Sequence, residues 1–125
     1  MIVGIGTDIV TISRMSDKLD NNGDRFAKRL LTDSEYSEYA AKQNGASFLA
    51  KRFAAKEATV KAMGTGFAEG ITWKHVAVRN NDKGAPYIEL SGPAREKADA
   101  LGVQRIHLTI SDEREHAVAF VILES

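Results

Sequence analysis

The sequence predicts an α+β fold in which helices pack on a sheet rich in antiparallel strands. Helical periodicity fills the first half of the chain, whereas strand-like alternation and turns fill the second half. The last two strands are expected to form a hairpin. A length of 125 residues favours a single domain, residues 1–125.

The first half begins with one strand and then becomes helical. Val and Ile alternate with Gly from Met1 to Asp8, which predicts the strand. After a first helical stretch, Asp24 is placed to cap a short helix that runs through Leu31. Thr32-Asp33-Ser34-Glu35 forms a capping-box pattern that opens another helix, which Gly45 is expected to end.

A long helix is predicted next, and strands dominate the remainder of the chain. The long helix runs from about Ser47 to Met63, with Gly64 placed to stop it. The elements expected after it are strands at Thr72–Arg79, Pro86–Leu90, Arg105–Ser111 and Ala117–Leu123, a turn at Asn80–Gly84, and a helix at Pro93–Leu101 closed by Gly102. The last strand is continuously apolar, which favours a central position in the sheet.

Composition excludes several classes of function. The chain has no cysteine, which rules out disulfides, thiolate metal sites and cysteine nucleophiles. Its formal net charge is zero, so bulk charge does not predict a nucleic-acid partner. No apolar run approaches the roughly 18 residues of a membrane span, and no signal peptide is evident. We therefore expect a cytoplasmic protein.

The predicted first strand places two glycines and a carboxylate on one face. Gly4, Gly6 and Asp8 share that face because side chains alternate along a strand. Glycines weaken a strand, and the usual compensation is the close approach of another backbone or of a ligand. Asp8 could then hold a metal ion. An ordinary edge strand with a solvated Asp is the competing interpretation. Ile9 rules out a dinucleotide-binding fingerprint.

The long helix and the residues before it carry a local surplus of positive charge. Five basic residues stand against the single acid Glu57: Lys42, Lys51, Arg52, Lys56 and Lys61. Such a surplus favours a phosphorylated ligand, although a solvated basic face is about as compatible with the charge count.

Helical spacing separates this charge from the core. Leu49, Phe53 and Val60 form an apolar stripe, and Glu57 and Lys61 lie on the adjoining stripe among small side chains. Glu57 and Lys61 could be an exposed i, i+4 ion pair, but such a pair does not require small neighbours. A ligand or a closely packed element would require them.

Two further features leave their functions open. Gly64-Thr65-Gly66 follows the long helix, where small residues would let a ligand touch backbone, although a plain helix end explains them as well. His107 and Thr109 lie on the polar face of their strand, which could contact phosphate, a neighbouring subunit or solvent. The three histidines show no zinc spacing, and the chain has no P-loop or serine nucleophile elbow.

Asp8 and Glu57 are the two carboxylates that these patterns single out. If they meet in space they suit magnesium, which commonly takes one or two protein carboxylates and completes its shell with water and substrate phosphate. With lysines around it, such a site has the outline of a phosphoryl-transfer centre.

Two motifs in combination resemble the signatures of holo-[acyl-carrier-protein] synthases, a family of 4′-phosphopantetheinyl transferases. The first is Gly4-Ile5-Gly6-Thr7-Asp8-Ile9-Val10 with Ile12 and Arg14, and the second is Lys51 to Ala58 with Lys61-Ala62 and Gly64-Thr65-Gly66. Gly84-Ala85-Pro86 and His107 to Ser111 match weaker landmarks. One departure is Asp112, where many members have histidine.

The resemblance implies a 4′-phosphopantetheinyl transferase fold and a magnesium-dependent reaction with coenzyme A. Asp8 and Glu57 would bind Mg²⁺. Glu57 would take the proton of a carrier serine, directly or through a metal-bound water, and Lys61 would stabilise the departing adenosine 3′,5′-bisphosphate. The coenzyme A contacts implied are Arg52, Lys56, Lys61, Gly64, Thr65, Gly66, Pro86, His107 and Thr109.

The resemblance also implies protein partners. Members of this length form homotrimers with active sites between subunits, so the glycine face of the first strand could meet the Glu57 helix of a neighbour. The acidic acyl carrier protein would dock on Arg14, Lys18, Arg25 and Lys28, in a role in fatty acid biosynthesis. The competing functions are a non-catalytic trimeric module that binds coenzyme A or a nucleotide, and a magnesium-dependent phosphohydrolase. Neither nucleic acid nor membrane is expected as a partner.

Overall fold

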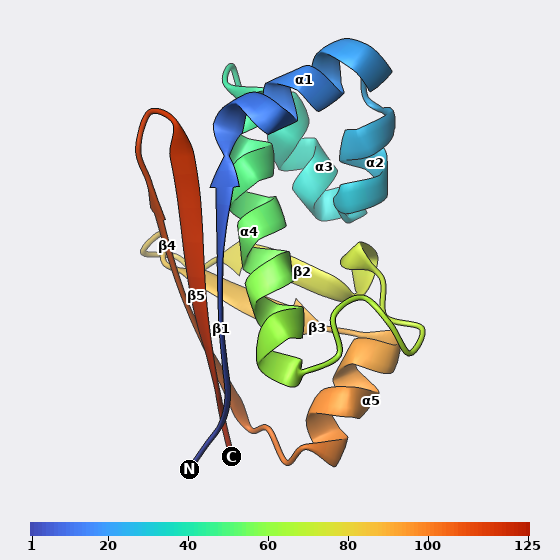
Figure 1. Cartoon of the computed structure of the whole chain (residues 1–125), viewed down its shortest axis with the longest axis vertical. Helices are drawn as coiled ribbons and strands as arrows, with labels where there is room; N and C mark the ends of the chain where they lie inside the picture. Colours follow the sequence, from blue (N-terminus) through green and yellow to red (C-terminus); the bar gives the residue numbers. More distant parts are fainter.

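The computed structural model describes residues 1–125 and confirms the α+β class (Figure 1). Five strands, five helices and one short 3₁₀ turn, η1, follow one another along the chain. In order they are β1 (Ile2–Thr11), α1 (Ile12–Asn22), α2 (Arg25–Leu30), α3 (Asp33–Ala40), α4 (Gly45–Met63), η1 (Trp73–His75), β2 (Val76–Asn80), β3 (Pro86–Leu90), α5 (Gly92–Ala100), β4 (Arg105–Asp112) and β5 (His116–Glu124).

The strands form two antiparallel sheets. One has the order β1-β5-β4, and the other is the β2-β3 hairpin. The predicted hairpin of the last two strands and the central place of β5 are therefore confirmed. Figure 1 shows α4 in the middle of the molecule, with the three-stranded sheet along one side, α1 to α3 at one end and α5 at the other. The two termini lie together, and the Ser125 amide donates to the Met1 carbonyl at 2.9 Å.

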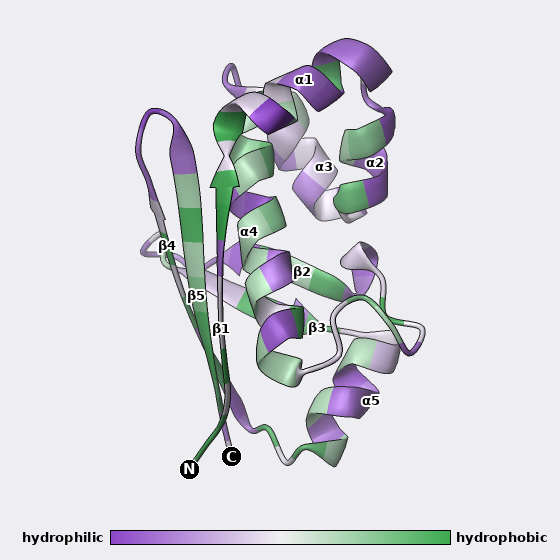
Figure 2. Cartoon of the chain, viewed as in Figure 1, coloured by the Kyte–Doolittle hydropathy of each residue, from purple (hydrophilic) through white to green (hydrophobic).

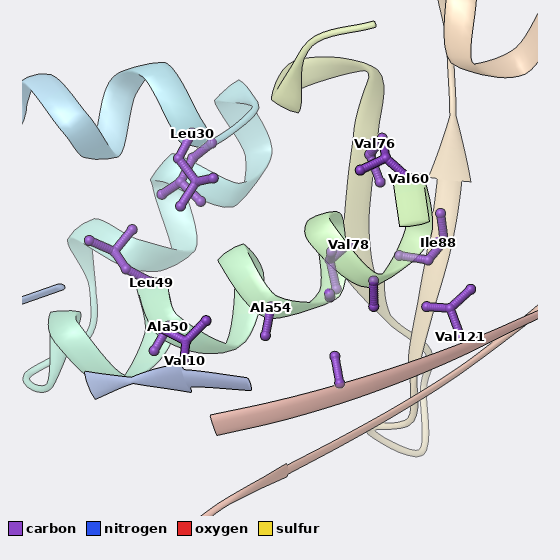
Figure 3. Close-up of a cluster of buried hydrophobic side chains, with 14 of the residues drawn as sticks. Val10, Leu30, Leu49, Ala50, Ala54, Val60, Val76, Val78, Ile88 and Val121 are labelled. Carbon is purple, nitrogen blue, oxygen red and sulfur yellow. The ribbon is translucent and has the colours of Figure 1, made fainter. Parts of the chain in front are cut away.

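The hydrophobic core surrounds α4 on two sides. Val10 of β1 and Val121 of β5 are fully buried beneath one side of the helix, and Val76 and Val78 of β2 are buried on another. Figure 3 shows these side chains converging on the helix from both sheets. Each large aliphatic side chain buried in this way stabilises the fold by about 1.5–3 kcal/mol. The helix is thus held on more than one face, and this fixes its position for the site.

The glycines of β1 allow α4 to approach the strand backbone. A Cβ atom on Gly4 would overlap the carbonyl oxygen of Ala62, and one on Gly6 would overlap that of Ala58. The close backbone contact that the glycine pattern predicted is therefore confirmed. It is made with α4 of the same chain, so the expectation that this face meets a neighbour's Glu57 helix is wrong.

Some element boundaries differ from the prediction. Gly45 is the first residue of α4 and does not end α3, which stops at Ala40. The Asn44 side chain accepts from the Ser47 amide at 3.1 Å and so begins α4 two residues earlier than expected. Asp24 occupies the N-cap of α2 without capping it, because its carboxylate accepts from the Tyr36 hydroxyl at 2.6 Å instead.

A second difference concerns the strand expected from Thr72. The structure has the turn η1 there, and β2 begins only at Val76. The Thr72 amide donates to His75 Nδ1 at 2.9 Å, which closes the turn and delays the strand. The capping box of α3 is confirmed, since Thr32 and Glu35 exchange both of its hydrogen bonds.

Candidate active site

The close packing of β1 on α4 brings the two predicted carboxylates to one place. Asp8 lies on the face of β1 that is turned toward α4, and Glu57 projects from the helix beside it. Lys61, one turn further along α4, donates to Asp8 Oδ1 at 2.9 Å and to the Thr7 carbonyl at 3.0 Å. The lysine thus ties the helix to the strand at the site.

Glu57 lies in an electrostatic environment that favours a bound proton. Partial burial raises the pKa of its carboxyl, and the negative charge of Asp8 raises this pKa further. The positive charges of Lys61 and Arg14 act in the opposite direction. Asp8 and Glu57 of a single chain are therefore close enough for their charges to interact, and Arg14 borders the same site.

The chemistry of these two carboxylates fits a magnesium ion. Asp8 Oδ2 is buried and has no hydrogen-bond partner, although buried carboxylate oxygens are normally paired. No cluster of three or more His, Asp or Glu side chains is arranged to hold a metal ion. A site with only two protein carboxylates suits Mg²⁺, because this ion commonly fills its other coordination positions with water and substrate phosphate.

A cavity of about 670 Å³ opens near the start of α4. Lys42, Lys51 and Arg52 bring positive charge to it, and Gly84 and Pro86 close it from the β2–β3 turn. Its other lining residues include Glu38, Asn80 and Asp112. Arg52 lies five residues before Glu57, which is about 7.5 Å along a helix axis. The cavity and Glu57 thus lie at successive parts of one helix.

Arg52 is held in this cavity by its neighbours. Its Nη2 donates to Glu38 Oε2 at 3.0 Å and to Asn80 Oδ1 at 3.1 Å, and its guanidinium lies 4.5 Å from the centre of the Phe48 ring. Its Nε is buried without a partner. A planar cation fixed in this way presents its charge in a defined direction.

The prediction that Lys56 contacts coenzyme A is wrong. The side chain of Lys56 is 0% exposed, and Nζ donates to Glu35 Oε1 at 2.7 Å. The other two donors of Nζ go to the carbonyls of Leu30, at 2.7 Å, and Trp73, at 2.9 Å. Desolvation lowers the pKa of Lys56, and the charge of Glu35 opposes this shift. With its three donors used, Lys56 has none left for a phosphate.

Glu35 is the residue that sequence reasoning missed. Its role in the capping box was evident, but its carboxylate is 1% exposed and also accepts from the Val78 amide at 2.7 Å. Together with Lys56 it connects α3, α4 and β2 inside the core. No local pattern in the sequence links Glu35 with Lys56, because the two residues are 21 positions apart and meet only in the folded chain.

His107 and Thr109 lie on the far face of the three-stranded sheet. In register across the strands, Ile5, Ile122 and His107 form one row, and Thr7, Phe120 and Thr109 form the next. His107 Nε2 lies 3.0 Å from Glu124 Oε1, and this contact lowers the pKa of Glu124. Neither His107 nor Thr109 lines the cavity of their own chain.

The remaining predicted residues lie in two places: directly after α4, and on helices α1 and α2. Gly64 and Gly66 have φ of 78° and 59°, and nothing lies where their Cβ atoms would be, so the backbone there is open. Thr65 Oγ1 donates to the Gly66 carbonyl at 2.7 Å. Lys18 Nζ lies 5.0 Å from the centre of the Phe26 ring, and Arg25 and Lys28 are exposed on α2.

Comparison with known proteins decides the family. The sequence profile of the 4′-phosphopantetheinyl transferase superfamily matches residues 4–121, which include both motifs and the whole site. The chain belongs to this superfamily. Among curated relatives, the holo-[acyl-carrier-protein] synthase of Vibrio cholerae is 51% identical over 99% of the chain and 98% of its own length. That of Nitrosococcus oceani is 50% identical over 98% of the chain and 80% of its own length.

Solved structures of this superfamily confirm the fold. The holo-[acyl-carrier-protein] synthase of Neisseria meningitidis matches with a TM-score of 0.92 at 39% identity, covering all of both chains. The synthase from Bacillus anthracis, solved in complex with CoA (3′,5′-ADP), matches at 0.84 and 38%, covering 100% of this chain and 98% of its own. The predicted phosphopantetheinyl transferase fold is thereby confirmed.

Proposed function

We propose that this chain transfers 4′-phosphopantetheine from coenzyme A to a serine of an apo-acyl carrier protein. The observation that carries the proposal is the Asp8–Glu57 pair, with Lys61 bound to Asp8 and with the basic cavity further along the helix that carries Glu57. Two acids and a cavity with three cations on one helix match a reaction on a diphosphate. The curated relatives that match over nearly the whole chain are named for the same activity.

The chemistry assigned to the chain's own residues follows from their geometry. The serine oxygen attacks the β-phosphorus of coenzyme A, the bond from that phosphorus to the bridging oxygen breaks, and adenosine 3′,5′-bisphosphate leaves. Glu57, whose pKa is raised, accepts the serine proton directly or through a water. Lys61 stabilises negative charge on the departing bisphosphate. Magnesium held by Asp8 and Glu57 would supply further neutralisation of the diphosphate charge.

The nucleotide is assigned to the cavity at the start of α4. Arg52 and Pro86, both expected as coenzyme A contacts, line it together with Lys42 and Lys51. Gly64, Thr65 and Gly66 offer open backbone at the other end of α4, where the pantetheine arm would run. Lys56 is left out of this assignment because it is buried and fully paired.

A homotrimer accounts for the placement of His107 and Thr109. The outer face of the three-stranded sheet exposes Ile5 by 62%, Ile9 by 63% and Phe120 by 39%, and Figure 2 shows hydrophobic residues along β5 and at the end of β1. Large exposed apolar patches mark interaction surfaces. If three such faces pack together, His107 and Thr109 on β4 of one subunit can contact the cavity of a neighbouring subunit.

The acidic carrier is assigned to the region around α1 and α2. Arg14 borders the catalytic carboxylate, as its influence on the pKa of Glu57 indicates. Lys18, Arg25 and Lys28 follow along the same two helices. Charges at such a rim chiefly accelerate association and set the correct orientation.

One assay tests the proposed function against its two rivals. The protein is mixed with coenzyme A, magnesium and apo carrier, and the carrier is weighed by mass spectrometry. A gain of one phosphopantetheine group is expected. Bisphosphate released without modified carrier would instead indicate a phosphohydrolase, and no product at all would indicate a binding module.

The cellular setting is part of the same proposal. No helix in the structure combines the length and apolarity that a bilayer crossing demands. We place the reaction in the cytoplasm, where acyl carrier proteins would be prepared for fatty acid biosynthesis. Localisation of a tagged full chain by fractionation checks the compartment.

A further inference from the structure

A second basic hollow opens between α2 and η1. Its volume is about 670 Å³, and its six lining residues include four cations and no acid: Arg25, Lys28, Arg29, Thr72, Trp73 and Lys74. None of these four cations takes part in the ion pairs of the structure. In a chain of zero net charge, four unpaired cations around one hollow create a strongly positive local potential.

Trp73, which lines the hollow, carries a hydrogen-bond donor without an acceptor. Trp73 Nε1 is buried and has no partner. An indole N–H can only donate, and a buried donor left unpaired costs about 1–3 kcal/mol. The Arg29 guanidinium lies 5.9 Å from the centre of the Trp73 ring, so this cation is placed at the aromatic wall of the hollow. A carboxylate that enters the hollow would meet the charge of Arg29.

The walls of the hollow are fixed before any ligand arrives. The ammonium group of Lys56 donates to the carbonyl of Leu30, the last residue of α2, and to that of Trp73, the first residue of η1. One buried side chain therefore sets the separation of the two walls. A site held in this way loses less conformational entropy on binding than a mobile one.

An aromatic floor connects the hollow with the catalytic helix. The Trp73 ring lies 5.9 Å from Phe26 and 6.0 Å from Phe53, measured between ring centres. Phe53 precedes Glu57 by one helical turn and is only partly buried. The aromatic cluster thus extends from η1 to the helix that carries Glu57.

We propose that this hollow receives acidic side chains of the carrier protein, so that the docking surface crosses from α2 onto η1. The inference rests on the proposed function and adds Arg29, Trp73 and Lys74 to the residues that recognise the carrier. Four cations spread over two elements, with an aromatic floor between them, fit several carboxylates on one folded partner. A single small anion would engage fewer of them.

Charge reversal tests the kinetic part of the inference. For Lys74→Glu and Arg29→Glu we expect kcat/KM for the apo carrier to fall by about tenfold or more each, with a weaker dependence on salt. KM for coenzyme A should stay within about twofold, because neither residue lines the nucleotide cavity. Arg95→Glu on α5 is the matched control, since Arg95 is 65% exposed and the charge change is the same. Equal losses in the control, or none in either variant, would overturn the proposal.

Trp73 supplies a direct binding readout, because it is the only tryptophan of the chain. Titration with a carrier that lacks tryptophan, without coenzyme A, should change its fluorescence, and Lys74→Glu should weaken that response by about tenfold. A response to inorganic phosphate equal to that of the carrier would show a small-anion site and refute the inference.

The same experiment separates this inference from the proposed function. Absence of phosphopantetheine transfer by the wild-type protein would refute the proposed function itself. Normal wild-type transfer with an unchanged carrier response in both reversal variants would refute only the docking surface. Replacing acidic residues on the carrier by lysine should restore activity to Lys74→Glu, and failure of each such exchange would argue against a direct contact.

Discussion

At the scale of single residues, two consecutive residues of α4 have different roles, one in the core and one at the site. Lys56 is buried and pairs with Glu35, whereas Glu57 projects beside Asp8 at the surface. Consecutive helical residues point about 100° apart, so one can serve the core while the next serves the chemistry. The basic residues grouped together in the sequence therefore have different functions in the structure.

Glu57→Gln is expected to lower turnover by about 10²-fold or more, since the variant loses its proton acceptor. Carrier modification followed by mass spectrometry measures the loss, and circular dichroism checks that the variant folds. Near-normal turnover would remove Glu57 from the mechanism.

The same substitution has a pH-dependent effect on stability. The pKa of Glu57 is raised in the folded state above its ordinary value of 4.5, so the folded state binds this proton more tightly than the unfolded chain does. The resulting stabilisation is complete below the unfolded pKa and is lost as pH rises through the folded pKa. Without magnesium, Glu57→Gln should therefore be more stable than wild type at pH 7, with the difference vanishing below about pH 4.

Thermal melts at several pH values measure this difference. Addition of magnesium should raise the Tm of the wild type more than that of the variant, because binding to the folded state stabilises it. A variant that is less stable than wild type at pH 7 without magnesium would contradict the assigned burial and repulsion.

Lys56→Met is expected to destabilise the fold by about 3–5 kcal/mol, because it leaves the buried Glu35 carboxylate without its partner. Urea unfolding measures the loss. Lys51→Met on the same helix is the matched control, and it should instead raise KM for coenzyme A while changing stability by less than about 0.5 kcal/mol. Equal stability of the two variants would show that the buried pair is not needed.

At the scale of elements, α4 and β1 form the frame of the site. The two glycines of β1 replace side chains with direct backbone contact, which places Asp8 beside the helix surface that carries Glu57 and Lys61. The helix also carries the cavity at its other end. Movement of α4 relative to β1 would therefore disturb the proposed magnesium site and the proposed nucleotide site together.

Gly6→Ala tests this frame. The new methyl group would overlap the Ala58 carbonyl, and relief of that overlap is expected to cost about 1–3 kcal/mol and to lower turnover by displacing Glu57. Thr7→Ala is the neighbouring control, because Thr7 faces the other way and loses only a 2.9 Å hydrogen bond to the Ala119 carbonyl, worth about 1 kcal/mol. An active, stable Gly6→Ala enzyme would show that the close approach is dispensable.

At the scale of the whole molecule, the sheet has one face on the core and one face exposed. The inner face packs on α4, and the outer face combines apolar residues of β1 and β5 with a polar column on β4. An exposed apolar face of this kind is typical of an interaction surface. In the proposed trimer this face would be buried, and His107 is proposed to contact the cavity of a neighbouring subunit.

Phe120→Asp is expected to convert the proposed trimer into a folded, inactive monomer, because a charge at the centre of the outer face opposes burial. Analytical ultracentrifugation measures the mass. Tyr87→Asp is the matched control, since Tyr87 and Phe120 are both 39% exposed but Tyr87 lies on β3. A Phe120→Asp protein with the mass and activity of the wild type would refute the interface.

The sequence by itself determined the α+β class, the order of most elements, the last hairpin and the two carboxylates. These follow from local patterns: alternation in strands, caps in helices, and motifs whose residues are near one another in the chain. The Asp8 motif and the Glu57 motif were each evident without any structure. Local chemistry also explains the capping box at Thr32 and Glu35.

Only the tertiary structure decided which residues meet. It placed Gly4 and Gly6 against α4 of their own chain, buried Lys56 on Glu35, and replaced the start of a strand with the turn at Trp73. Sequence spacing sets the direction of a side chain relative to its own element, but contact with another element depends on how the elements pack. Charge counts therefore could not separate the buried Lys56 from the cavity-lining Arg52.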